Sequence, residues 1–487
     1  MTTFAQAVLN QEARTVNGMK ARKSTAKSNV DLFYKIGASR GKNIIPDFVA
    51  GLAENKDVAL RIAQWARDIR QGAGERQIFR DILLYLDKND PDTAVALLYK
   101  VPELGRYDDL LLPFQNEVVK STAYSIIGHA LKEGNGLAAK WMPRKGPQAV
   151  FLRRFFGLTP KSYRKMLVEL TNVVESQMCK NDWDNINFNH VPSLASSRYK
   201  KAFNRHTKKY GEYVAALVSK DPKVRETVKV NAGAVYPYDV LKGFISLYMN
   251  NSYGKNEKDH IKAQWEALPD YMGGQKVLPL VDVSGSMTSP VGHNSNLTCL
   301  DVSVSLGLYC AEKNKGVFKD TFLTFSGTPE LLHLKGDIIQ KAEQMVRSTW
   351  QMNTNLHAAL RKILTTAKDA RLPQDEMPNM LLILSDMQFD ACVTRERGDS
   401  SAMEMIREEY ANAGYKAPEV VFWNLNSYDN VPVKYDERGA ALVSGFSPSI
   451  LKSVLSADMD NFTPEGIMLK TLMNPRYDLD IEEETGE

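Results

Sequence analysis

The sequence predicts a multidomain protein in which an all-α helical solenoid or ring is followed by an α/β domain with a doubly wound sheet. In the first part, apolar residues recur at spacings of three and four, which is typical of amphipathic helices. After Tyr271-Met272-Gly273-Gly274, short apolar runs alternate with helical stretches, which is typical of a parallel sheet covered on both faces. The length of 487 residues agrees with this division, because a single hydrophobic core stops growing well below that size.

The pattern of the first part indicates a series of helical hairpins. Ile62 and Trp65 mark one helix face, the turn Gln71–Gly74 ends that helix, and Ile78 and Ile82 mark the next. We expect HEAT-like units from this pattern, although the sequence has no exact repeat period. Further helices are expected at Thr93–Leu104, Leu110–Glu133, Ser162–Ser176, Gly211–Ser219, Tyr238–Asn250 and Asp259–Leu268.

The second part predicts a Rossmann-like arrangement of strands and helices. Strands are expected at Val277–Val283, Thr321–Phe325, Met380–Leu384, Val420–Leu425 and Ala440–Val443. Helices are expected at Leu300–Lys313, Ile338–Arg347, Leu356–Lys368, Ala402–Ala413 and Pro448–Leu455. The predicted divisions are a flexible N-terminal segment (1–27), a helical-repeat domain (28–273), an α/β domain (274–457) and a loosely held acidic tail (458–487).

Composition excludes several classes of protein. No apolar run approaches the roughly 20 residues that span a bilayer, so we expect no membrane partner. The N-terminal stretch lacks the pattern of a secretory signal, so a cytoplasmic location is expected. Four scattered cysteines predict buried thiols and neither a disulfide framework nor a C-x-x-C metal site.

The net charge of +4 conceals an asymmetry between the two parts. Residues 1–275 hold 42 lysines and arginines against 28 acids, whereas residues 276–487 hold 20 against 30. Two windows of the basic part, Gly134–Val168 and Asn185–Gly211, contain no acid and interleave cations with aromatic residues. Such windows are either solvated helix faces or a surface that attracts a polyanion such as RNA. The RNA-binding candidates are Lys140, Trp141, Arg144, Lys145, Arg153, Arg154, Lys161, Arg164, Lys165, Arg198, Lys200, Lys201, Arg205, Lys208 and Lys209.

A metal-binding pattern follows the first predicted strand of the α/β domain. Asp282, Ser284 and Ser286 place a carboxylate and two hydroxyls at alternate positions of a loop. Thr354 precedes a predicted helix and Asp386 follows a later strand, so both are expected at the same sheet edge. Five hard oxygens suit Mg²⁺ or Mn²⁺. In the alternative interpretation, Asp282 and the two serines only cap a helix.

This pattern resembles the metal-ion-dependent adhesion site of the von Willebrand factor A family. The resemblance rests on D-x-S-x-S after the first strand, a threonine, and an aspartate after a later strand. It implies that the metal keeps one coordination position open for a carboxylate, Asp or Glu, of a partner protein. The insertion Pro290–Asn296 departs from the family pattern and affects the mouth of the site.

The helical part resembles the TROVE module of the Ro autoantigens. The resemblance rests on Arg67–Arg76, Gly105–Leu110 and Ala139–Pro143, and strings such as Ser385–Asp390 resemble a related, poorly characterised family that also ends in a von Willebrand A domain. It implies a ring whose basic hole accepts single-stranded ends of structured or misfolded RNA and whose outer surface holds a small noncoding RNA. Arg67, Arg70 and Arg76 have an alternative role as buried partners of nearby acids.

Three classes of function remain open. The first is an RNA-binding ribonucleoprotein scaffold, and the second is a non-enzymatic assembly factor whose metal site captures a carboxylate of a partner. The third, an enzyme, is the least favoured, because the sequence contains no Walker A string, H-E-x-x-H or G-x-S-x-G motif. We therefore expect no catalytic residues.

Overall fold

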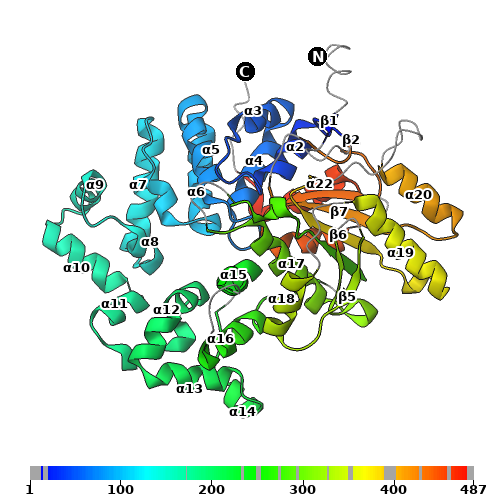
Figure 1. Ribbon diagram of the computed structural model, residues 1–487. Helices are drawn as coiled ribbons and strands as arrows, with labels where there is room; N and C mark the ends of the chain where they lie inside the picture. The colour runs from blue at the N-terminus through cyan, green and yellow to red at the C-terminus, as the bar shows by residue number, and fades with distance from the viewer. Residues whose placement is uncertain are drawn as a thin grey trace. The chain divides into compact units, whose positions relative to one another are not determined.

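The computed structural model describes residues 13–14, 20–171, 173–231, 235–247, 254–272, 276–291, 296–325, 328–348, 355–388, 402–426, 430–457 and 462–479 (Figure 1). The chain forms two compact units. The α/β unit comprises Met1–Ala59 with Val235–Met473, and the helical unit comprises Leu60–Ala234 with Asn474–Glu487. The predicted fold class, a helical region followed by a doubly wound α/β sheet, is confirmed.

The α/β unit is built on a six-stranded sheet with the strand order β5-β4-β3-β6-β7-β8. The strands are β3 (Val277–Val281), β4 (Thr321–Thr324), β5 (Leu331–His333), β6 (Met380–Ser385), β7 (Glu419–Asn424) and β8 (Ala440–Ser444). All neighbours pair in parallel except β5, which runs antiparallel to β4 at the sheet edge. The sequence pattern did not predict β5, because a three-residue, partly exposed edge strand carries little periodic signal.

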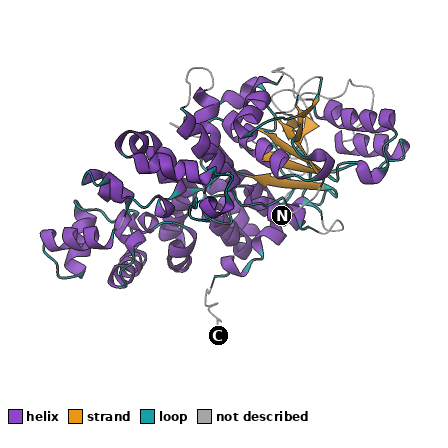
Figure 2. Cartoon of the chain, turned by 90° about the horizontal axis from the view of Figure 1, so that it is seen from below, coloured by secondary structure: helices purple, strands orange, loops and turns teal. Residues whose placement is uncertain are grey.

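Helices cover both faces of this sheet (Figure 2). On one face, α17 (Cys299–Lys313) comes so close to β3 that a Cβ on Gly307 would lie 2.4 Å from Val281. On the other face, Leu278 and residues of α19 (Leu356–Ala370) line a cavity of about 410 Å³. Successive residues of a strand point to opposite faces, so every residue of β3 is buried.

Segments from both ends of the predicted helical domain belong to the α/β unit, which differs from the predicted boundary of 28–273. Helix α2 (Ser28–Ile36) packs against α3 (Ile45–Glu54) and against β8, where Ser444 accepts a hydrogen bond from Gly37 N and donates one to Phe33 O. Helix α15 (Pro237–Leu247) packs on α17 and on α16 (Lys255–Glu266). These apolar helix faces are buried within the α/β unit, which explains the difference.

The α/β unit contains further helices beside those already described. They are α18 (Ile338–Arg347), α20 (Ala402–Asn412), α21 (Leu451–Leu455) and α22 (Pro464–Leu472). Helix α22 packs on β8 and buries Ile467 and Leu472. The prediction that 458–487 is a loosely held tail is therefore wrong for α22, because an apolar helix face holds this segment on the sheet.

The prediction that 1–27 is flexible is wrong for its last residues. The short strands β1 (Ala13–Arg14) and β2 (Lys20–Ala21) pair with each other. Arg22 exchanges two backbone hydrogen bonds with Val431, and Thr25 O accepts one from Tyr435 N. Backbone pairing to the α/β unit thus orders residues 20–25, a long-range contact that local composition cannot reveal.

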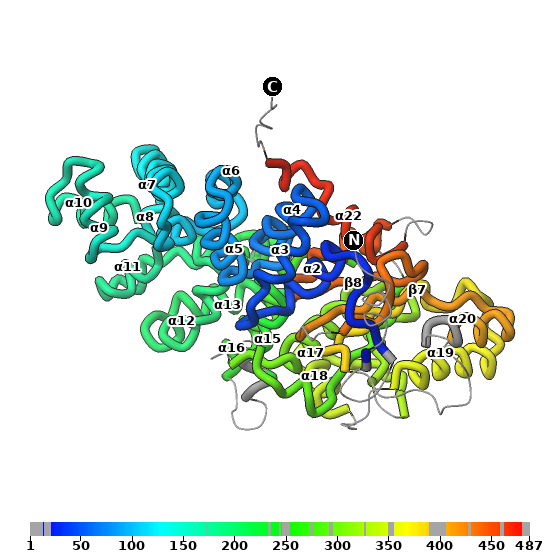
Figure 3. Tube along the Cα trace, turned by 90° about the horizontal axis from the view of Figure 1, so that it is seen from above, coloured from blue at the N-terminus to red at the C-terminus, as the bar shows by residue number. Residues whose placement is uncertain are grey.

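The helical unit is a succession of short helices (Figure 3). They are α4 (Lys56–Arg67), α5 (Arg76–Asn89), α6 (Pro91–Leu104), α7 (Glu117–Lys132), α8 (Gly136–Trp141), α9 (Pro147–Phe155), α10 (Pro160–Leu170), α11 (Val174–Cys179), α12 (Ser193–His206), α13 (Lys208–Leu217) and α14 (Pro222–Arg225). Contacts run mainly between helices close in sequence, as in α5–α6, α6–α7 and α12–α13. This is solenoid-like packing, and closure into a ring stays a prediction.

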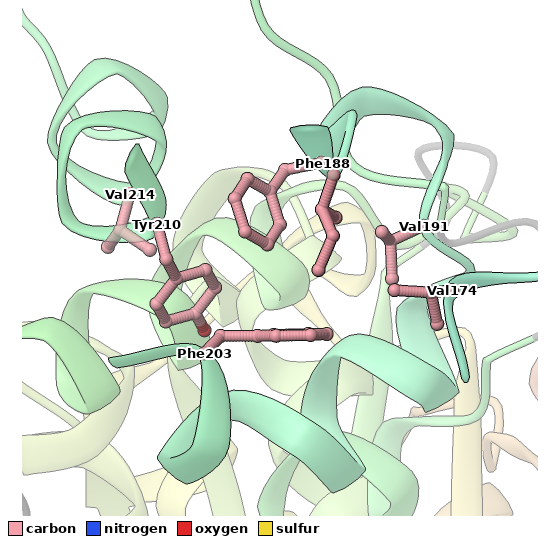
Figure 4. Packing of buried hydrophobic residues seen from close by; sticks show 7 residues of the cluster. Val174, Phe188, Val191, Phe203, Tyr210 and Val214 are labelled. Carbon is pink, nitrogen blue, oxygen red and sulfur yellow. The ribbon is translucent and has the colours of Figure 1, made fainter. Parts of the chain in front are cut away.

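An aromatic cluster forms the core around α12 and α13 (Figure 4). The ring of Phe203 lies beneath those of Phe188 and Tyr210, at centroid distances of 5.2 and 5.5 Å. Val174 and Val214 complete the cluster. Aromatic residues of the second basic window thus serve the core, as their burial requires.

The chain's last described residues return to the helical unit. Tyr477 is buried, its hydroxyl donates to Asp68, and its backbone carbonyl accepts from Gln64. Arg476 donates two hydrogen bonds to Asp68, and Asp478 pairs with Arg61. Residues 474–478 are thus a docked clip, which again corrects the prediction of a loosely held tail.

No helix within the described residues is long and apolar enough to cross a membrane.

Candidate metal centre and nucleic-acid interface

Two of the predicted metal ligands meet at the carboxyl ends of adjacent strands. Strands β3 and β6 pair with Val281 opposite Leu384, and Asp282 N donates to Leu384 O at 3.1 Å. Asp282 and Asp386 therefore lie side by side, just beyond the ends of two adjacent strands. The strand order reverses between β3 and β6, which is where doubly wound sheets bind ligands.

The loop after β3 brings the two predicted serines to the same place. Ser284 N donates to Asp282 Oδ1 at 2.9 Å, and the hydroxyls of Ser284 and Ser286 lie 3.1 Å apart. A short 3-10 helix, Gly285–Thr288, follows Ser284. Neither serine side chain caps that helix, so the capping alternative is not what the structure shows.

Ser385 is a site residue that the sequence analysis did not assign. Its hydroxyl donates to Asp282 Oδ2 at 2.5 Å and accepts from Met387 N at 3.0 Å. Met387 has a positive φ of 63°, a strained conformation for a non-glycine residue. The sequence does show a hydroxyl-bearing residue directly before Asp386, and this position could have identified Ser385 as part of the candidate site.

The electrostatics of the site favour a bound cation. Burial raises the pKa of Asp282 to about 6, and the neighbouring Asp386 charge adds to this. Burial also raises the pKa of Asp386, whereas the Ser286 hydroxyl and, more weakly, the Lys42 ammonium lower it. Asp386 Oδ2 is buried and has no hydrogen-bond partner in the described part of the chain. A divalent cation would neutralise both carboxylates and satisfy this orphaned oxygen, so the residues present fit Mg²⁺ or Mn²⁺.

The fifth predicted ligand, Thr354, lies outside the described residues. Its neighbour Asn355 caps α19, whose first residue is Leu356. Within the described residues, no group of three or more His, Cys, Asp or Glu side chains could hold a metal. A metal at this edge would therefore depend on hydroxyl oxygens beside the two aspartates.

In a buried ion-pair network of the helical unit, Arg67 takes the alternative role of a buried partner of a nearby acid, whereas Arg70 and Arg76 are exposed. Arg67, 1% exposed, lies 2.7 Å from Asp109, which is fully buried. Arg80 contacts Asp109 at 2.6 Å and Asp108 at 2.8 Å. Arg70 donates to the backbone carbonyl of Glu103. The network ties α4, α5 and the segment after α6 together.

Most predicted RNA-binding cations lie on the surface of the helical unit. Lys140, Arg153 and Lys200 are half-buried, and the other cations are exposed. Lys165 pairs with Glu169 at 3.6 Å, and Lys209 donates to the backbone carbonyl of Asp184. The exposed set comprises Arg144, Lys145, Arg154, Lys161, Arg164, Lys165, Arg198, Lys201, Arg205, Lys208 and Lys209.

Two of the aromatic residues between these cations, Trp141 and Tyr163, are largely withdrawn from the surface. Trp141 is half-buried, and the guanidinium of Arg106 stacks on its ring at 3.7 Å from the centroid. Tyr163 is buried, and its hydroxyl donates to Pro143 O at 3.3 Å. Phe151 and Phe155 of the first window, in contrast, are exposed, so this window presents cations together with two aromatic rings on which a base could stack.

These features define a class of protein with a basic helical unit and a doubly wound sheet that carries aspartate and serine residues at its topological switch point. Two family models match the chain. A domain of unknown function (DUF2828) matches residues 15–104 and 125–275, and another (DUF7788) matches residues 276–476. The two matches meet where the sequence pattern changes from helices to alternating strands and helices.

The chain is similar to two further proteins. The uncharacterized protein L728 of Acanthamoeba polyphaga mimivirus is 28% identical over 523 residues, which covers 95% of this chain and 88% of that protein. Among solved structures, the Ro (RSR) protein of Deinococcus radiodurans matches with a TM-score of 0.41 and 14% identity, over 91% of this chain and 99% of that one.

Proposed function

We propose that this protein is an RNA-binding scaffold whose helical unit holds single-stranded or structured RNA through its phosphates. The observation that carries the proposal is the exposure of most cations in two acid-free windows, Gly134–Val168 and Asn185–Gly211. Exposed lysines and arginines neutralise phosphates and release counterions, a contribution that does not depend on sequence. The sequence resemblance to the TROVE module supports the same function.

A salt titration tests this proposal. Replacing Arg144, Lys145, Arg154 and Lys161 by glutamine should lower the slope of log K against log salt for a single-stranded RNA, by about 0.7 for each phosphate that is no longer neutralised. The matched control replaces four exposed lysines of the α/β unit, Lys315, Lys319, Lys335 and Lys368, by glutamine. Unchanged affinity and slope in the first variant would show that the windows are solvated surface.

A second function is favoured by a separate observation, the orphaned Asp386 Oδ2 beside buried Asp282. We propose that Asp282, Ser284, Ser286 and Asp386, with Thr354, hold Mg²⁺ or Mn²⁺, directly or through water. When bound, the metal would supply a Lewis-acidic position for a carboxylate of a protein partner. Ser385 would keep Asp282 oriented toward it through their hydrogen bond.

A thermal-shift measurement tests the metal site. Mn²⁺ should raise the melting temperature of the wild type and leave that of the Asp282→Ala/Asp386→Ala variant unchanged. Asp369→Ala, which removes an exposed acid of α19, is the control and should respond as the wild type does. An equal response in the double variant would refute the site.

A further inference from the structure

Two exposed phenylalanines lie one helical turn apart on α9. Phe151 is 44% exposed and Phe155 is 46% exposed, whereas Ala149 and Leu152 of the same helix are buried. Residues four apart are neighbours on a helix surface, so the two rings form one patch. The core already has its contacts with α9 through the buried residues. Neighbouring apolar side chains that a fold leaves exposed mark a binding surface.

Contacts with α7 hold both rings in place. The Phe151 ring lies against the Tyr124 ring, with the centroids 4.2 Å apart and the planes inclined by 31°. Phe155 lies so close to α7 that a Cβ on Gly128 would be 2.5 Å from its ring. The Phe156 ring meets the Phe155 ring edge to face, at 5.2 Å between centroids. Rings that are already held in position lose little conformational entropy when a ligand stacks on them.

Cations lie beside the two rings. Tyr124, Gly128 and Lys132 are spaced by four on α7, and the ammonium group of exposed Lys132 lies 5.4 Å from the centroid of the Phe155 ring. Arg154 is exposed three residues after Phe151, on the same side of α9. An aromatic surface with adjoining cations suits a ligand that combines flat rings with negative charge.

The acids of this region leave its charge strongly positive. Residues 117–170, from α7 to α10, hold 10 lysines and arginines against three glutamates. Glu117 pairs with Lys120 and Glu169 pairs with Lys165, whereas Glu133 is exposed beside Lys132. This excess of positive charge favours a polyanion over an apolar protein partner as the ligand of the patch.

We propose that Phe151 and Phe155 form a platform on which bases of single-stranded RNA stack, with Lys132 and Arg154 as partners of the adjoining phosphates. The proposal rests on the RNA-binding function proposed above and adds to its phosphate contacts a contact with the bases. Every base has an aromatic face, so the platform would accept any sequence. It would favour single strands over duplexes, whose bases are already stacked on one another.

The test compares two single-stranded oligonucleotides of equal length and charge, an oligoadenosine and an abasic one. Phe151→Leu/Phe155→Leu keeps apolar side chains but removes both rings. It should weaken oligoadenosine binding about tenfold for each ring on which a base stacks, and leave abasic binding and the salt slope unchanged. Lys132→Gln should weaken binding of both and lower the salt slope by about 0.7. The control Tyr99→Leu, which removes an exposed ring of α6, should bind both as the wild type does.

The outcomes separate this inference from the general function. If the phenylalanine variant binds oligoadenosine like the wild type while the four-residue window variant binds it more weakly, the platform is refuted and the RNA-binding function stands. Equal losses for the oligoadenosine and the abasic oligonucleotide would show that the rings are structural, and would also refute the platform. Loss of self-association with unchanged RNA affinity would assign the patch to a second copy of the chain instead. If the wild type binds neither oligonucleotide, both proposals fail.

Discussion

Asp282 and Asp386 are two buried carboxylates whose charges oppose each other across the end of one strand pair. The raised pKa of Asp282 means that the folded protein holds its proton to higher pH than an unfolded chain does. In the metal-free protein, stability associated with this group is therefore present below the ordinary aspartate pKa of about 4 and is lost as the pH rises through about 6. At neutral pH, a bound cation would stabilise the ionised carboxylates and so offset the free-energy cost of burying their charges.

Metal binding should consequently depend on pH. Because Mn²⁺ must displace the proton of Asp282, its affinity should rise up to about pH 6 and then level off, and should be about tenfold weaker at pH 5 than at pH 7.5. Calorimetric titration at several pH values measures this. A pH-independent affinity would contradict the role of Asp282.

Ser385 is a second residue that should influence metal binding, because its side chain orients Asp282. Ser385→Ala removes the hydrogen bond to Asp282 Oδ2 and should weaken Mn²⁺ binding by about 10- to 100-fold, as the removal of outer partners does in metal sites. Ser385→Thr keeps the hydroxyl and should restore most of the affinity. If both variants bind Mn²⁺ like the wild type, the orientation of Asp282 does not depend on Ser385.

At the scale of elements, the Arg67–Asp109 pair holds the helical unit together where α4, α5 and the segment after α6 meet. Arg67→Met should lower the free energy of unfolding by about 3 kcal/mol, because Asp109 stays buried with one partner fewer. Denaturant unfolding measures this. Lys120→Met, which breaks an exposed pair with Glu117, should cost at most about 1 kcal/mol.

The docked C-terminal clip, residues 474–478, should also stabilise the helical unit. A variant that ends at Met473 lacks buried Tyr477 and the Arg476–Asp68 ion pair and should be less stable by about 3 kcal/mol. A variant that ends at Leu479 keeps both and should unfold like the full chain. Equal melting temperatures for the two variants would show that the clip contributes nothing.

At the scale of the whole molecule, the two proposed activities belong to different compact units. The cations of the basic windows are in the helical unit, and the metal residues are in the α/β unit. RNA affinity should therefore change less than twofold when EDTA is added at constant ionic strength. A large drop in RNA affinity on chelation would show that the metal site takes part in RNA binding.

Local sequence pattern was sufficient to predict most strands and helices of the α/β unit and the position of Asp282 and Asp386 at one sheet edge. Its apolar runs are strongly periodic, and Asp282 and Asp386 stand just after buried strands, so the pattern places them at one sheet edge. The cations of the helical unit were also evident from the sequence, since charge depends on composition alone.

Which segments pack together could be learned only from the folded chain. The docking of α2 and α22 on β8, the clip at Tyr477 and the burial of Arg67 against Asp109 join residues far apart in the sequence. The role of Ser385 also depends on Asp282, a neighbour in space that no local pattern identifies. The physical reason is that burial and ion pairing are properties of neighbours in space, whereas periodicity and composition report neighbours in sequence.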